Sequence, residues 1–171
     1  LRGHNILKNK LHSLFRYCGI LWDVEPYGVF GDLVPQQPLN RAQAFRAAQT
    51  IIPDLSVELP DALGGTRRHF IEVKTVSGLT KWYLPARGER AVERRNMAIH
   101  REYRTAAALA DQRYYGTMDG PISQRLATLS LTGASFGRFC ETTDTVHNLV
   151  AIMAKARVEK QTLAWGRGEA E

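Results

Sequence analysis

Two neighbouring runs carry most of the structural information in this chain: "IIPDLSVELP" at residues 51–60 and "RRHFIEVKTV" at residues 67–76. Both are rich in apolar and β-branched residues, which is typical of buried strands. Charge interrupts each of them, with Asp54 in the first run and Glu72 and Lys74 in the second. We therefore expect two buried strands that hold acidic and basic side chains for a functional reason.

Side-chain alternation indicates where these charges point. In a regular strand successive side chains face opposite sides of the sheet, so Glu72 and Lys74 share one face and Val73 lies on the other. The Gly64-Gly65 pair between the two runs predicts a hairpin turn. Because a hairpin makes the two strands neighbours, we expect Asp54 to face the same cleft as Glu72.

The chemistry of this cleft follows from its residue types. Two converging carboxylates repel each other unless a cation joins them. Asp54 and Glu72 offer hard oxygen ligands, which suit Mg²⁺ or Mn²⁺, and the backbone carbonyl of Val73 could be a further ligand. Lys74 would then lie beside a metal-bound water, where an amine can orient that water and offset charge that develops on a phosphate. These are the requirements of phosphodiester hydrolysis.

The rest of the chain supplies the other elements of a sheet protein. Helical stripes, β-branched runs and glycine or proline breaks predict their order. We expect a helix at 5–18, a strand within 20–30, strands at 51–60 and 67–76, a helix at 89–112, a short helix at 122–129, a strand at 130–139 and a helix from 143 to about 160. This order predicts an α/β fold with a mixed central sheet flanked by helices on both faces.

Pro53-Asp54 followed by Glu72-x-Lys74 on the next strand resembles the motif of the PD-(D/E)xK nuclease superfamily, whose core has a similar αβββαβ order. More narrowly, "RGHNILKNKLHSLFRYCGILWDVEP", "PDLSV" and "FIEVKTV" are similar to the restriction-like endonuclease domains of non-LTR retrotransposons. The likeness spans residues 2–76, and residues 90–160 share only the helix order. It implies a restriction-endonuclease-like core and a metal-dependent endonuclease from a mobile element or its polymerase polyprotein. Asp54 and Glu72 would be metal ligands, and Lys74 the catalytic lysine.

Two further metal ligands are considered. The resemblance rests partly on the start of the first helix, Arg2-Gly3-His4-Asn5, and it implies that His4 lies near the metal; an ordinary surface histidine is the alternative. Many superfamily members carry a glutamate on this helix, which here has no acid, so the full ligand set stays open. Glu25, at the end of the first predicted strand, is either a third metal carboxylate or a solvated charge.

Nucleic-acid contact is expected from the net charge of +6 and from two groups of residues. A basic stripe at helical spacing would bind phosphates, or would be a solvated helix face balanced by glutamates. In the loop after Lys74, a cation beside an aromatic ring would stack on unpaired bases, or would pack over the core. The stripe consists of Arg90, Arg94, Arg101 and Arg104, and the loop pair of Lys81 and Trp82.

Length and composition set the organisation. With 171 residues, 44% of them hydrophobic, the chain suits a single domain at 1–165, with an insertion at about 32–50 and a tail at 166–171. It has no apolar run of roughly 18 residues, so no membrane span is expected. It begins at Leu1 rather than Met, which we interpret as a piece of a larger polyprotein. The isolated Cys18 and Cys140 favour a reducing compartment, nuclear or cytoplasmic.

Two alternatives to a simple endonuclease remain. One is a catalytically inactive nuclease fold that serves as a nucleic-acid-binding or docking module. The other is a homodimer that resolves branched DNA with the same chemistry. DNA is the favoured substrate, with RNA as the alternative.

Overall fold

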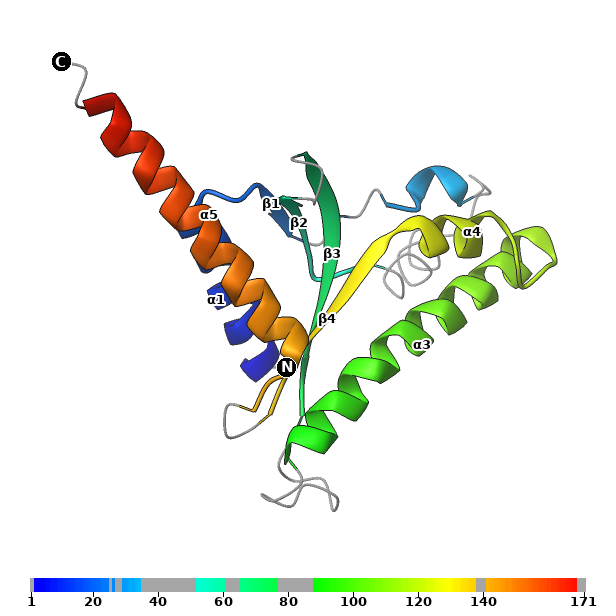
Figure 1. The fold of residues 1–171 in the computed structure, drawn as a ribbon. Helices are drawn as coiled ribbons and strands as arrows, with labels where there is room; N and C mark the ends of the chain where they lie inside the picture. The colour runs from blue at the N-terminus through cyan, green and yellow to red at the C-terminus, as the bar shows by residue number, and fades with distance from the viewer. Residues whose placement is uncertain are drawn as a thin grey trace.

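A computed structural model describes residues 2–24, 26, 29–34, 52–60, 65–76, 88–137 and 141–168. Helices and strands alternate along this part of the chain (Figure 1). The elements are α1 (Arg2–Cys18), β1 (Trp22–Val24), the 3₁₀ turn η1 (Gly31–Leu33), β2 (Leu55–Pro60), β3 (Thr66–Thr75), α3 (Gly88–Tyr115), α4 (Pro121–Thr128), β4 (Ser130–Phe136) and α5 (Asp144–Gly168).

The four strands form one mixed sheet in the order β1-β2-β3-β4. β1 pairs antiparallel with β2, and β2 pairs antiparallel with β3. β4 pairs parallel with β3, which requires a crossover connection, and α3 and α4 provide it. The predicted α/β class, with a mixed sheet flanked by helices, is confirmed.

One face of the sheet packs against α1 and α5, which lie together beside it in Figure 1. The side chains of Leu55 and Val57 on β2 and of Ile71 and Val73 on β3 are buried there. Phe15 of α1 is fully buried against them. The alternation expected for these strands is therefore observed, with the apolar side chains toward α1 and α5.

The other face lies under α3 and α4. Ile99 and Tyr103 of α3 pack with Ile122 of α4 in a second apolar cluster. α3 approaches β4 closely at Gly133, where a Cβ atom would lie 2.1 Å from the side-chain oxygen of Asn96. A glycine is therefore required at this point.

Two helix ends show why these segments stop and start where they do. Gly19 has a positive φ of 73° and ends α1, with its N–H bonded to Arg16 and the N–H of Ile20 bonded to Phe15. α4 begins after Gly120 with Pro121 in its first turn. The buried Asp111 of α3 accepts hydrogen bonds from three backbone N–H groups at this start, those of Gly120, Ile122 and Ser123.

Some expected boundaries differ. α5 continues to Gly168, three residues into the expected tail, and α1 begins at Arg2. β1 is only three residues long and mostly exposed, consistent with a short edge strand that ends before Pro26. Gly64 and residues 35–50 of the expected insertion lie outside the described residues. No helix in the described ranges combines the length and hydropathy that a bilayer crossing requires.

Candidate active site

The pairing of β2 with β3 sets Asp54 across from Glu72, but the two side chains contact different helices, α1 for Asp54 and α3 for Glu72. Leu55 is the register partner of Ile71, so continuing the register by one residue sets Asp54 across from Glu72. Oδ2 of Asp54 accepts a 2.8 Å hydrogen bond from the backbone N–H of Val73. Asp54 itself lies just outside β2, because Pro53 before it has no N–H with which to continue the ladder.

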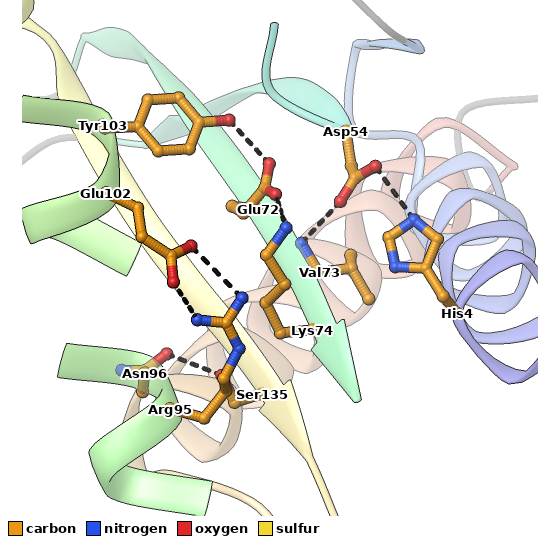
Figure 2. A network of polar contacts seen from close by, with 10 residues as sticks. All are labelled: His4, Asp54, Glu72, Val73, Lys74, Arg95, Asn96, Glu102, Tyr103 and Ser135. Atoms are coloured by element: carbon orange, nitrogen blue, oxygen red, sulfur yellow. Dashed lines mark hydrogen bonds and ion pairs between the residues drawn. The ribbon is translucent and has the colours of Figure 1, made fainter. Parts of the chain in front are cut away.

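His4 reaches the same carboxylate from the first turn of α1. Its Nε2 lies 3.1 Å from Oδ1 of Asp54, and both side chains are partly buried. Figure 2 shows Asp54 and His4 on one side of Val73, and Glu72 and Tyr103 on the other. His4 therefore lies beside Asp54, one of the two expected metal ligands.

Glu72 is buried, with 6% of its surface exposed, and both of its oxygens have partners. Oε1 pairs with the ammonium of Lys74, two residues along the same face of β3. Oε2 accepts a 2.6 Å hydrogen bond from the hydroxyl of Tyr103 on α3. A buried carboxylate is costly unless it is paired in this way, so the two partners stabilise its charge.

The Tyr103 hydroxyl is held in its protonated form. Burial, followed by the charge of Glu72 and its hydrogen bond, raises the pKa of Tyr103, and the charges of Asp54 and Glu102 raise it further. Tyr103 is therefore a fixed donor to Glu72.

A second ion pair lies next to Lys74. The guanidinium of Arg95 contacts both oxygens of Glu102, one of them at 3.2 Å. The paired Arg95 holds the pKa of the Glu102 carboxyl below its usual range against the opposing effect of burial, and the charges of Lys74 and Arg101 lower it further. Lys74 is thus placed between two acids, Glu72 and Glu102, while Arg95 brings a second cation to the same side of the sheet (Figure 2).

Asn96 connects three elements beside this site. Its Oδ1 accepts a 3.3 Å hydrogen bond from the hydroxyl of Ser135 on β4, and its Nδ2 lies 3.5 Å from the hydroxyl of Thr145 on α5. These contacts fix the first turns of α3 against the sheet. Because Tyr103 and Arg95 are carried by α3, they also fix the position of both side chains.

Comparison of the chain with protein-family models, with curated proteins and with solved structures gives no match. Function therefore has to be inferred from the side chains that meet around Glu72.

Tyr103, Arg95, Asn96 and Ser135 were not predicted as site residues. Tyr103 lies on the buried side of α3, with Ile99. The signal that could have identified it is the hydroxyl itself, because a tyrosine on a buried stripe needs a hydrogen-bond partner. Arg95 forms an ion pair with Glu102, seven residues later on the same helix. Charged residues at this spacing also occur on solvated helix faces, so the sequence alone does not identify the pair.

The arginine stripe lies elsewhere. Arg90, Arg94, Arg101 and Arg104 are all exposed on α3. At 3.6 residues per turn the stripe is centred on the side of the helix opposite Ile99, so most of it faces away from Glu72 across a helix about 10 Å wide. Arg90, Arg94 and Arg101 are therefore placed for phosphates at a distance from the two acids. Glu25, Lys81 and Trp82 lie outside the described residues.

The donor chemistry of this site fits a hard divalent cation. Asp54 and Glu72 each offer two oxygens, and the backbone carbonyl of Val73 directly follows Glu72 in the chain. Each carboxylate oxygen has one protein donor and keeps a second lone pair. Within the described residues no three His, Cys, Asp or Glu side chains come close enough to hold a metal by themselves. The two carboxylates supply hard oxygen atoms, the ligand type that Mg²⁺ takes.

Proposed function

We propose that this chain is a metal-dependent endonuclease that hydrolyses phosphodiester bonds of nucleic acid, built on a restriction-endonuclease-like core. The observation that carries the proposal is the placement of Asp54 across from Glu72 just before β2, with Lys74 paired to Glu72 on β3. The αβββαβ order of the elements is a second support, because it is similar to the order of the superfamily's core. The three residues also form the PD-(D/E)xK pattern on neighbouring strands.

Each residue has a distinct role in this proposal. Asp54, Glu72 and the carbonyl of Val73 would hold Mg²⁺ or Mn²⁺, with His4 either orienting Asp54 or acting as a further ligand. When bound, such an ion polarises the phosphate and lowers the pKa of a coordinated water. Lys74 would orient the attacking water and offset the negative charge that develops on the phosphate during the attack.

Two other side chains support this group. The Tyr103 hydroxyl holds Oε2 of Glu72, so the carboxylate keeps one orientation while Lys74 moves between Oε1 and the substrate. Arg95, paired with Glu102, would bring a further cation to a phosphate oxygen. Interactions of this kind with the residues behind a metal ligand commonly change affinity or activity by about 10- to 100-fold.

The wider biological setting is also proposed. DNA is the favoured substrate, bound along the arginine stripe of α3, and the chain would act inside the cell as part of a mobile element or its polyprotein.

The proposal is tested by incubating the protein with single-stranded and duplex DNA and RNA, each with Mg²⁺, Mn²⁺ or a chelator. We expect cleavage of at least one substrate with a divalent ion and none with the chelator. Asp54→Ala should abolish cleavage while nucleic-acid binding stays measurable. Cleavage by Asp54→Ala with the same metal dependence would refute the assignment.

One observation favours the alternative of a binding module without catalysis. All four carboxylate oxygens of Asp54 and Glu72 already accept a contact from a protein group, including the cationic Lys74. A chain that retains nucleic-acid binding but cleaves nothing with any ion would be such a module.

A further inference from the structure

A pocket lies beside the candidate active site, between α3, α4 and the start of β4. Its volume is about 590 Å³, within the range of sites that take small organic molecules. Leu126 of α4 and Leu131 of β4 line its apolar part. His100 and Arg104, one turn apart on α3, line it with polar groups, and both are exposed.

Tyr103 connects this pocket to the two acids. Its side chain contributes to the lining of the pocket, while its hydroxyl donates to Oε2 of Glu72. The register of the sheet also places the pocket close to Glu72, because Gly133 on β4 is the register partner of Glu72. Leu131 lies two residues before Gly133, which is about 7 Å along the strand. The pocket is thus a single side chain away from the proposed reaction centre.

The lining matches the two parts of a nucleotide. An apolar pocket wall of leucines with an aromatic ring at its inner end suits the flat face of a base. The polar part of the lining includes His100, Arg104 and the acidic Asp119. The planar guanidinium of Arg104 suits the attached phosphate. The Nε of Arg104 donates to the carbonyl of His100 at 3.4 Å, which holds the arginine along the helix at this opening.

We infer that this pocket receives one unpaired nucleotide of the substrate near the two acids, with its base against the leucines and its phosphate at Arg104. The inference rests on the proposed function and deepens it. A base can enter only when it is unstacked, so the preferred substrate is single-stranded or locally unpaired. A free mononucleotide has the same chemistry, and the test separates the two sources.

The test measures binding by the Asp54→Ala protein, which is not expected to cleave. The probe is a short single-stranded oligodeoxynucleotide containing 2-aminopurine, whose fluorescence reports unstacking of that base. We expect a saturable change in fluorescence. Ala127→Trp, at an exposed position of the pocket lining, should weaken this binding by about tenfold or more, as expected for the loss of a stacked base. Ala154→Trp, exposed on α5 across the sheet, is the matched control and should bind normally.

Arg104→Glu provides a second variant that leaves the apolar lining intact and should also weaken the signal. Unchanged fluorescence on saturation, or equal binding by Ala127→Trp and Ala154→Trp, would overturn the inference. Binding of free dAMP without binding of the oligonucleotide would also overturn it, and would assign the pocket to a mononucleotide. Because the readout is binding by a chain without Asp54, a failure of the proposed nuclease activity leaves this measurement interpretable.

Discussion

Tyr103 of α3 donates a 2.6 Å hydrogen bond to Oε2 of Glu72 on β3, and both side chains are buried. The bond joins the longest helix to the strand that carries the acid-x-lysine pair. Its geometry makes the position of the Glu72 carboxylate depend on the packing of α3, so stability and the proposed chemistry are coupled at this contact.

Tyr103→Phe keeps the ring and removes the donor. We expect the unfolding free energy to fall by about 1–3 kcal/mol at neutral pH, because one buried oxygen of Glu72 loses its partner. Folding raises the pKa of Tyr103, so its protonated form contributes its full stability at pH values below 10.0, the ordinary pKa of tyrosine. This contribution declines as the pH rises above that value. Chemical unfolding at several pH values should show that the difference between wild type and Tyr103→Phe shrinks above about pH 10. A constant difference would contradict this account.

His4→Ala removes the contact with Oδ1 of Asp54 from the start of α1. We expect the cleavage rate to fall by about 10- to 100-fold with little change in thermal stability, since the residue is partly exposed. His4→Gln, which can still donate to the carboxylate, should recover part of the loss if His4 acts by orienting Asp54. Equal loss in both variants, together with weaker Mn²⁺ binding, would instead indicate direct ligation.

Gly133→Ala tests the close approach of α3 to β4. The added Cβ would lie 2.1 Å from Oδ1 of Asn96 and 2.7 Å from Ile99, so the helix must shift. We expect a destabilisation of about 1–3 kcal/mol, measured by thermal or chemical unfolding. Gly3→Ala is the control, because a Cβ at Gly3 in α1 meets nothing within 4 Å. An equal effect of both substitutions would refute the proposed packing constraint.

The arginine stripe is tested through the salt dependence of nucleic-acid binding. Each Arg→Gln change at positions 90, 94 and 101 should weaken binding and reduce the slope of log affinity against log salt by about 1, if that arginine contacts a phosphate. Arg16→Gln, exposed on α1 beyond the other face of the sheet, is the control. Unchanged slopes would make the stripe a solvated helix face.

Much of the fold could be predicted because local patterns and tertiary contacts agree. The alternation of Ile71, Glu72, Val73 and Lys74 sorts an apolar face from a charged one, and both strands follow it. α1 ends at Cys18 as expected, because the next residue, Gly19, adopts the positive φ that terminates the helix. The Glu72-x-Lys74 pair and Asp54 could be expected to come together because a hairpin makes their strands neighbours.

The parts of the site on α3 could not be predicted in the same way. Tyr103 lies 31 residues after Glu72, and their contact depends on how α3 crosses the sheet, which no local pattern specifies. The arginines at helical spacing formed a visible stripe, whereas Arg95 lies outside that stripe and is turned toward Glu102 beside Lys74. The pocket between α3 and α4 has no sequence signature, because its lining is assembled from three elements.

The most direct test of the central claim is a Mn²⁺ titration by calorimetry, since the claim is that Asp54 and Glu72 hold one divalent ion. We expect saturable binding by the wild type, and a loss of affinity of at least about tenfold in Asp54→Ala and in Glu72→Gln. Glu58→Gln, which removes an acid on β2 that pairs with Arg68 at 3.5 Å, should bind like the wild type. Equal Mn²⁺ affinity in all four proteins, or no binding by the wild type, would contradict the account.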